Sequence, residues 1–366
     1  RSIGHRCPAR HSVRLPPPRG ARTVRGPPLW YAAIMSNRPS FSVAVIGAGL
    51  SGLVVARRLK NVAEVTIYEK SRGPAGRMAT RRAGDFEFDH GAQFFTARTR
   101  AFREFLDPLL HSDIVANWQA DFAELDRSGI RAQRAWDASY PHFVGTPAMN
   151  RIGKHLSNGL NVVLETQVAK ISRRNGSWVL YDERNAELGC FDWVVLAAPA
   201  PQTRALAEEI PALVDLCDSR SMHGCFAMML GFAEPLQLSW QAGLVRDADV
   251  SWISVNSSKP GRKPPFTLVV HSTNAWADAH IDQDTEQVLE HLLAEASSVT
   301  GENLDTAVHR QVHRWRYANI DKQSGPAYFI DGDARLAACG DWFVRGRIES
   351  AFTSADELAA RLLDRL

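Results

Sequence analysis

A glycine motif directly after a short apolar run limits the folds open to this sequence more than any other feature. Residues 43–46 are all apolar and predict a buried strand. Gly47, Gly49 and Gly52 follow with the spacing GxGxxG, in which the glycines permit a tight turn, backbone approach to a pyrophosphate and close packing of a helix on the strand. The motif predicts a dinucleotide-binding βαβ unit whose phosphates lie at the N-terminus of a helix over residues 53–59.

An acidic residue stands where such a unit needs one. Residues 65–68 predict a second strand that ends at Glu69, about 20 residues after the glycines, where a carboxylate binds a ribose hydroxyl. Glu69 also disfavours a 2′-phosphate, because the two negative charges would repel each other. The unit alone fits FAD and NAD equally, because both present adenosine diphosphate to the same turn.

The loop after Glu69 contains Ala75, Gly76 and Arg77. It resembles the flavin amine oxidase superfamily, in which the acid at the end of the second strand is followed by a pair of glycines and an arginine, an extension that nicotinamide dehydrogenases lack. Gly76 and Arg77 match this pattern, and Ala75 replaces the first glycine. The Arg77 guanidinium is expected to bind pyrophosphate or ribose oxygens.

A second flavin signature stands near the C-terminus. Gly340 and Asp341 end an apolar strand, and a helix is expected to begin at about Ser350. In related flavoproteins the aspartate meets the ribityl chain, and the helix N-terminus faces the flavin edge that gains negative charge on reduction. A flavin contact and a helix cap are both open for the Ser350 hydroxyl.

Longer stretches are similar to the bacterial branch of the renalase family. They are residues 89–98, 144–150, 252–262, 270–272 and 313–318. The likeness extends from residue 41 to the end of the chain. It implies FAD held without a covalent bond, a flavin-stacking loop at residues 91–93, and oxidation of the 1,2- and 1,6-dihydro isomers of NADH and NADPH.

The predicted fold class is α/β, with a Rossmann-type FAD-binding domain and an interleaved α+β substrate domain on an antiparallel sheet, as in p-hydroxybenzoate hydroxylase and the amine oxidases. Residues 41–100, 145–215 and 330–366 are expected to form the FAD-binding domain, and residues 101–144 and 216–329 the substrate domain. Further strands are expected over residues 160–163, 168–173, 178–181, 193–199, 226–232, 250–255, 267–272 and 308–315. Thr146 is expected to cap a helix that has Pro147 in its first turn.

The site residues follow from these motifs and from the resemblance. The residues expected to hold FAD are Gly47, Gly49, Leu50, Ser51, Gly52, Glu69, Lys70, Gly76, Arg77, Met78, Gly91, Ala92, Gln93, Phe94, Val168, Gly340, Asp341, Arg347, Glu349, Ser350 and Ala351. Asn256 and His271 are expected in the substrate pocket, because they are polar residues in strands that should face the flavin. Trp315 or Tyr317 is expected to form an aromatic wall beside them.

No metal site is expected. His309 and His313 are four residues apart, as zinc ligands on a helix would be, but residues 308–315 alternate like a strand and offer no third ligand. The five cysteines are odd in number, are scattered and form no CxxC pair, which favours a reducing compartment, the cytoplasm by default. They are Cys7, Cys190, Cys217, Cys225 and Cys339.

The basic charge of the chain is concentrated in its first 34 residues, which carry seven arginines, six prolines and no acid. Without those arginines 36 basic residues face 40 acidic ones, so the formal net charge changes from +3 to −4. Neither a nucleic-acid nor a membrane partner is therefore expected, and no apolar run approaches the roughly 20 residues that span a bilayer. Residues 1–40 are expected to be a disordered tail or a non-native leader, with Met35 as the natural start; an organelle-targeting segment is the alternative.

The function expected from the resemblance is that of an FAD-dependent oxidoreductase. It would accept a hydride from isomeric dihydronicotinamide dinucleotides and pass the electrons to oxygen or a quinone. A flavin amine oxidase acting on a small primary amine or polyamine is an alternative, but its cage of paired tyrosines is hard to assemble from six Tyr residues. A flavin-binding protein without turnover is a third possibility.

Overall fold

The glycine motif lies between the first strand and the first helix of a six-stranded sheet. Residues 41–365 are described by the structure, a computed structural model, and the expectations for residues 1–40 lie outside them. The strands are β1 (Ser42–Ile46), β2 (Glu64–Tyr68), β9 (Asn161–Val163), β13 (Trp193–Leu196), β19 (Tyr328–Asp331) and β20 (Leu336–Cys339). Their order is β19-β20-β13-β1-β2-β9, and all neighbours are parallel except β19 and β20.

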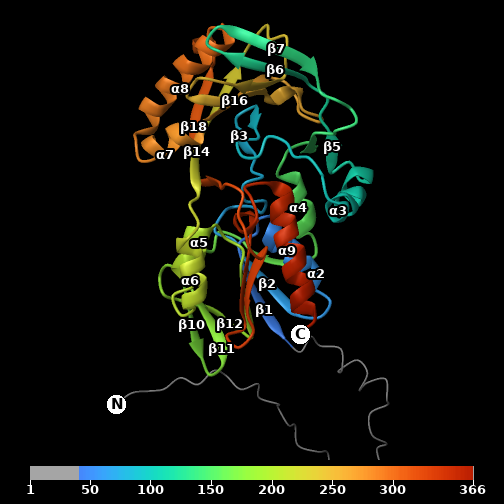
Figure 1. Ribbon diagram of the computed structural model, residues 1–366, viewed down its shortest axis with the longest axis vertical. Coiled ribbons are helices and arrows are strands. Elements are labelled where there is room, and N and C mark those ends of the chain that lie inside the picture. The colour runs from blue at the N-terminus through green and yellow to red at the C-terminus, as the bar shows by residue number, and fades with distance from the viewer. Residues whose placement is uncertain (1–40, 366) are drawn as a thin grey trace, which may run out of the picture. The chain divides into compact units, whose positions relative to one another are not determined.

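Two helices cover one face of this sheet. Helix α2 (Leu50–Leu59) packs against α9 (Ile348–Leu363), and Figure 1 shows the two running side by side next to β1. Residues 43–46 are buried, because the central strand of a parallel sheet is covered on both faces. Each Val, Leu or Ile side chain buried here stabilises the fold by about 1.5–3 kcal/mol. The result is a rigid base under the glycine turn.

The second large sheet has seven strands. They are β6 (Asp121–Asp126), β7 (Gly129–Ala135), β14 (His223–Phe232), β15 (Ala242–Val245), β16 (Val250–Val255), β17 (Phe266–Ser272) and β18 (His309–Asn319). Their order is β18-β14-β17-β16-β15-β6-β7, antiparallel except for the parallel pair of β6 and β15. Helices α7 (Asn274–His280) and α8 (Thr285–Thr300) pack on this sheet, at the opposite end of Figure 1 from β1 and β2.

Smaller sheets and helices complete the described part of the chain. A three-stranded sheet contains β10 (Lys170–Arg174), β11 (Ser177–Tyr181) and β12 (Glu187–Phe191), and the two strand pairs are β3 (Arg81–Ala83) with β4 (Phe86–Phe88) and β5 (Val115–Asn117) with β8 (Phe143–Gly145). The remaining α-helices of the described chain are α3 (Arg100–His111), α4 (Arg151–Ser157), α5 (Ala200–Leu206) and α6 (Pro211–Asp218). The β3–β4 hairpin packs on β17 and brings its own residues to the gap between the two sheets.

The sequence predicted most of these strands, but the helix expected at residue 147 was wrong. Helix α4 begins at Arg151 with Asn150 as its N-cap. The backbone N–H of Met149 donates a 2.9 Å hydrogen bond to Asp89 Oδ1. This tertiary contact holds the segment after Pro147 in a turn, and the helix can begin only beyond it.

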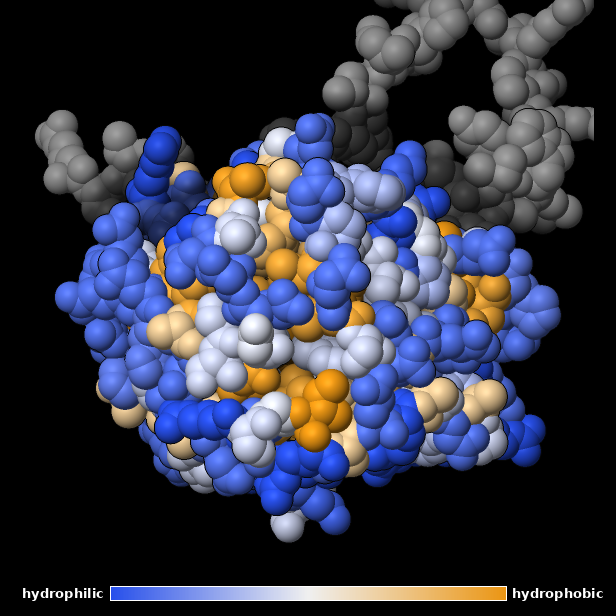
Figure 2. Space-filling model, turned by 90° about the horizontal axis from the view of Figure 1, so that it is seen from above, coloured by the Kyte–Doolittle hydropathy of each residue, from blue (hydrophilic) through white to orange (hydrophobic). Residues whose placement is uncertain are grey.

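The predicted α/β class, with a Rossmann-like parallel sheet and a second, mostly antiparallel sheet, matches the structure. Residues 41–365 belong to one compact unit, and the division into two domains remains a prediction. The view onto β6 and β7 shows mostly hydrophilic side chains with small apolar patches between them (Figure 2). Within residues 41–365, no helix combines the length and the apolar character that crossing a membrane requires.

Candidate functional site

A cleft of about 1800 Å³ is lined by residues from both large sheets. Pockets for one small ligand are usually about 300–1,000 Å³, so this cleft has room for a dinucleotide and a second molecule. It extends from the glycine turn after β1 to the inner ends of β17 and β18.

The glycine turn has the shape that a pyrophosphate needs. A Cβ atom on Gly49 would meet no atom within 4 Å, so the backbone there is open to the cleft. A Cβ on Gly52 would lie 2.0 Å from the carbonyl oxygen of Gly47, which is the close packing expected of the third glycine. Helix α2 has no side-chain cap and no acid in its first turn, so its free N–H groups remain available to phosphate oxygens.

Glu69 closes the other side of this turn. Its Oε2 atom accepts a 2.8 Å hydrogen bond from the backbone N–H of Ala48, and Oε1 accepts one of 2.8 Å from that of Ser71. The carboxylate is buried at the end of β2, where the predicted ribose contact would be made. The turn, the helix end and the acid therefore fit the adenosine diphosphate half of FAD.

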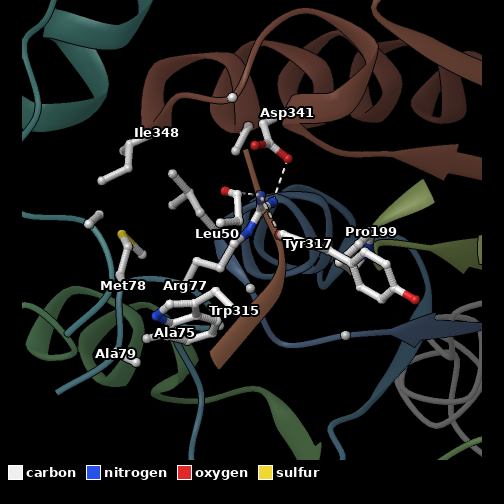
Figure 3. Close-up of a pocket in the computed structure, with 18 of the residues that line it drawn as sticks. Leu50, Ala75, Arg77, Met78, Ala79, Pro199, Trp315, Tyr317, Asp341 and Ile348 are labelled. Atoms are coloured by element: carbon white, nitrogen blue, oxygen red, sulfur yellow. Dashed lines mark hydrogen bonds and ion pairs between the residues drawn. The ribbon is translucent and has the colours of Figure 1, made fainter. Parts of the chain in front are cut away.

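The two flavin signatures meet in space. Arg77 forms an ion pair with Asp341 and donates a 3.1 Å hydrogen bond to the carbonyl oxygen of Ala318, and Figure 3 shows its guanidinium pointing to Asp341. The helix predicted from about Ser350 is α9, which begins at Ile348 with Arg347 as its N-cap. The capping alternative for Ser350 was therefore wrong, because that residue already lies in the first turn.

Most of the predicted FAD-binding residues line the cleft. The residues that do so are Gly47, Gly49, Leu50, Ser51, Glu69, Lys70, Gly76, Arg77, Met78, Gly91, Ala92, Gln93, Phe94, Val168, Gly340, Asp341, Arg347, Glu349 and Ala351. Gly52 and Ser350 do not, because Gly52 packs on the turn and Ser350 is buried within α9. The assignment of all these residues as FAD contacts remains a prediction.

Three of the four predicted substrate residues, His271, Trp315 and Tyr317, also line the cleft. In Figure 3 the ring of Tyr317 points away from Trp315, so these two rings do not form a pair. Asn256 does not line the cleft. It is fully buried, and its amide is used inside the protein: Nδ2 donates a 2.9 Å hydrogen bond to the carbonyl oxygen of Glu87.

A wall of three rings stands around Trp315. The rings of His90 and Trp315 stack with centroids 5.3 Å apart, and the His313 ring lies edge-on 4.3 Å from Trp315. The indole N–H donates a 2.9 Å hydrogen bond to the His90 carbonyl oxygen and fixes the wall. Burial lowers the pKa of His90 to about 3 and that of His313 to about 4, and the nearby charge of Arg81 adds to both effects. The wall is therefore aromatic and uncharged near pH 7.

A second group of aromatic residues stands in and beside the cleft. Of this group only Phe94 was predicted from the sequence. The rings of Trp136 and His142 stack 3.8 Å apart and nearly parallel, and Phe94 lies 5.3 Å from Trp252. Phe94, His142 and Trp252 line the cleft. Trp252 begins one of the stretches similar to the renalases, which is the signal that could have identified it.

The charged residues that line the cleft are mostly basic. The basic ones are Lys70, Arg72, Arg77, Arg81, Arg82, Arg98, Lys154, Arg314, Arg316 and Arg347, and the acidic ones are Glu69, Asp341 and Glu349. Glu349 accepts hydrogen bonds from the backbone N–H groups of Arg98 and Thr99, the latter of 2.7 Å. All three lining carboxylates among the described residues are therefore already bonded within the protein.

Within residues 41–365 no three His, Cys, Asp or Glu side chains are grouped as a metal ion would require. His309 lies on β18, where its ring stacks on Phe86 and Phe88.

Two family models match the chain. The model for NAD(P)-binding Rossmann-like domains matches residues 45–109, and the model for flavin containing amine oxidoreductases matches residues 105–363. The second match covers more than half of the 366 residues.

Solved structures of oxidases have a similar fold. A protein from Exiguobacterium sp. 255-15, assigned as a protoporphyrinogen oxidase, aligns with a TM-score of 0.72 at 13% identity, over 90% of this chain and 100% of that one. Wild-type putrescine oxidase bound to putrescine aligns with a TM-score of 0.65 at 13% identity, over 88% of this chain and 99% of that one. At this identity the likeness concerns the fold.

Proposed function

Because the chain belongs to the family of flavin containing amine oxidoreductases and FAD is its cofactor, we propose that it oxidises the 1,2- and 1,6-dihydro isomers of nicotinamide dinucleotides, as a member of the renalase branch. FAD would lie along the glycine turn, Glu69 and Arg77, with its ring system toward Gln93 and the N-terminus of α9. Bound there, FAD supplies the acceptor for a hydride. Oxygen or a quinone would then take the electrons.

The charge of the cleft is the observation that carries this proposal. Ten basic residues and three acids line it, and among the described residues only Arg77, Arg82 and Arg316 of the ten are paired with a carboxylate, so its potential favours an anionic ligand. Lys70, Arg72 and Arg77 lie near the FAD elements, but Arg81, Arg314 and Arg316 belong to the strands beside the ring wall. A dinucleotide carries two phosphate charges that such a surface would attract, whereas a polyamine carries positive charges that it would repel.

The ring wall suits a nicotinamide. His90, His313 and Trp315 are uncharged or apolar near pH 7 and present flat surfaces on which a ring can stack. A dihydronicotinamide becomes aromatic when it loses a hydride, so this reaction requires no general base. The residues of the chain would act by stacking, orienting and screening the ring from water.

An amine substrate has less support in this cleft. The structural likeness to putrescine oxidase concerns the fold, and the cleft offers no unbonded carboxylate among the described residues for an ammonium group. The lining tyrosines are Tyr68, Tyr140 and Tyr317. No pair of tyrosine rings within residues 41–365 lies in stacking contact as an amine cage would require.

The test is anaerobic reduction of the FAD-loaded protein, followed at the visible flavin band. The 1,2- and 1,6-dihydro isomers should bleach the band within seconds and ordinary NADH far more slowly. A stacked ring brings only particular carbons within the near-attack distance of about 3–3.5 Å, so a hydride on C4 is misplaced. Putrescine, spermidine and benzylamine should leave the band unchanged over minutes.

The comparison also tests the alternatives. Fast bleaching by an amine, with none by the isomers, would favour the amine oxidase function. No bleaching by any of these compounds, in protein that photoreduction still bleaches, would favour a flavin-binding role without turnover. Readmission of air after reduction measures whether oxygen is the acceptor.

A further inference from the structure

Lys259 is a buried cation behind the wall of the cleft. Its side chain is fully buried, and its ammonium group donates hydrogen bonds of 3.1 Å to Gln93 Oε1 and of 3.1 Å to Asn256 Oδ1. The ring of Trp118 lies 5.4 Å from Nζ. Gln93 lines the cleft and Lys259 does not, so the ammonium group acts on the cleft through the Gln93 amide.

The charge of Lys259 is not balanced by its neighbours. Asp89 Oδ2 lies 3.7 Å from Nζ, but the same oxygen also accepts a hydrogen bond from Arg262. Two buried positive charges therefore share one negative charge. Burial lowers the pKa of Lys259 to about 7; Asp89 opposes this change and Arg262 adds to it. An apolar side chain would fill this space without the desolvation free energy of a buried charge, so packing alone does not account for the lysine.

The partners of Gln93 allow one orientation of its amide. Oε1 accepts hydrogen bonds from Lys259 and from Ser254 Oγ, the latter of 2.8 Å. Nε2 faces the carbonyl oxygens of Asp89 and Gly91, the latter at 3.0 Å. While Lys259 is protonated, a half-turn of the amide would place its NH₂ group against an ammonium group and its oxygen against two carbonyls, and only Ser254 Oγ could still pair with it, by accepting a hydrogen bond.

This orientation determines the state of His271. Gln93 Nε2 lies 3.4 Å from His271 Nε2, and its two hydrogens are directed at the carbonyl oxygens of Asp89 and Gly91. An amide nitrogen cannot accept a hydrogen bond, so a proton on His271 Nε2 would find no acceptor there. This contact therefore favours a ring with its proton on Nδ1. Burial lowers the pKa of His271 to about 4, the charge of Lys259 adds to the effect and a hydrogen bond to the His90 backbone opposes it, so the imidazole is neutral near pH 7.

We infer that Lys259 is a positioning residue: it holds the Gln93 amide in one orientation and thereby fixes the His271 proton on Nδ1. His271 lines the cleft, so the lysine sets which hydrogen-bonding groups the cleft presents to a substrate. The same hydrogen bonds hold residues 91–93, the loop expected to face the flavin ring. Lys259 thus orients the side chains of Gln93 and His271 without contacting the substrate itself.

The test is ¹⁵N NMR of the FAD-loaded protein with labelled histidines, at about pH 6, where a histidine with a low pKa stays neutral. In the wild type, His271 Nε2 should have the chemical shift of an unprotonated ring nitrogen. Lys259→Met keeps the chain length but removes the donors, so the Gln93 amide is expected to rotate and His271 to carry its proton on Nε2. Flavin reduction by the dihydronicotinamide isomers should slow by about 10- to 100-fold at saturating substrate.

Two further variants separate positioning from stability. Arg262→Met removes the other buried cation, which does not contact Gln93, and should lower stability while His271 Nε2 stays unprotonated. Ser254→Ala removes the second donor to Gln93 Oε1 and should move His271 in the same direction as Lys259→Met, by a smaller amount. The kinetic readout rests on the proposed function, whereas the NMR readout does not, so the two can fail separately.

Either of two results overturns the inference. One is a wild-type His271 protonated on Nε2, and the other is a folded Lys259→Met protein with unchanged His271 signals. Should Lys259→Met not fold, the wild-type spectrum and Ser254→Ala decide the matter.

Discussion

The Glu69 carboxylate accepts a 2.8 Å hydrogen bond from the backbone N–H of Ala48, which ties the end of β2 to the glycine turn after β1. The carboxylate therefore has two roles. It holds the turn in the shape that admits a pyrophosphate, and it is placed to accept a hydrogen bond from a ribose hydroxyl. Loss of the carboxylate should weaken FAD binding by removing both interactions.

Glu69→Ala should weaken FAD binding by about 1–3 kcal/mol, or roughly 5- to 150-fold, the range for the loss of a buried hydrogen-bond partner. Glu69→Gln keeps one acceptor oxygen and should lose less. Glu64→Ala, at the exposed start of the same strand, is the matched control and should retain FAD. Reconstitution of each apoprotein with FAD, followed by flavin fluorescence, gives the FAD dissociation constants of the three variants. Equal losses of FAD affinity in Glu69→Ala and Glu64→Ala would show that Glu69 has no special role.

Gly49 and Gly52 should respond differently to the same added methyl group. A Cβ on Gly49 meets nothing in the protein, and the backbone there has φ −70°, so Gly49→Ala should fold with nearly normal stability but retain little FAD. A Cβ on Gly52 would lie 2.0 Å from the Gly47 carbonyl oxygen, so Gly52→Ala should destabilise the fold itself. Thermal unfolding of the apoproteins and their flavin content separate the two effects. A Gly49→Ala protein with full FAD content would argue against the pyrophosphate site.

These local parts of the site were predictable, because turn, strand and helix signals within about 30 residues encode the βαβ unit. The contacts behind the cleft were not. Asn256 was expected to face the flavin as a polar residue on a strand, but β16 ends at Val255 and Asn256 bonds to Glu87 instead. Nothing in the sequence near either residue encodes that pairing. Lys259 was missed for the same reason, since its role depends on Gln93, 166 positions away.

Stability should fall as the pH falls from about 6.5 toward 4, the interval between the usual histidine pKa and those of His271 and His313. In that interval the unfolded chain binds protons that the folded protein does not, so unfolding becomes more favourable at lower pH. His90, with a pKa of about 3, extends the effect to lower pH. Each of these histidines should contribute at most about 1.4 kcal/mol per pH unit, and His271 and His313, which are partly exposed, should contribute less than that.

Urea unfolding of the FAD-loaded protein at several pH values measures this dependence. His90→Gln should flatten the slope, whereas His111→Gln, an exposed residue at the end of α3, should leave it unchanged. A slope that is the same in all three proteins would place the acid sensitivity elsewhere in the chain.

Salt should weaken binding of the proposed substrates. Between about 0.05 M and about 0.5 M NaCl, screening shortens the range of the field from the basic cleft, so the dissociation constant of a dihydronicotinamide dinucleotide should rise. The limiting rate of flavin reduction should stay constant, because stacking on the ring wall is not a charge interaction. Stopped-flow reduction at several substrate concentrations yields the dissociation constant and the limiting rate. A dissociation constant that falls as the salt concentration rises would indicate that the cleft repels the substrate.

FAD should leave the protein when it is denatured by heat or acid, because Cys225, the one cysteine of the described residues that lines the cleft, is a poor nucleophile. Cys225 lines the cleft, but burial raises its pKa to about 12, with a small opposing effect from hydrogen bonds to Ser272. Only a trace of thiolate is then present near pH 7, and the thiolate is the form that would attack a flavin. Burial likewise raises the pKa of Cys217 and Cys339 to about 12. After acid precipitation the yellow colour should be in the supernatant for the wild type and for Cys225→Ala alike. Flavin that stays on the wild-type pellet, but not on that of Cys225→Ala, would identify Cys225 as the point of a covalent bond.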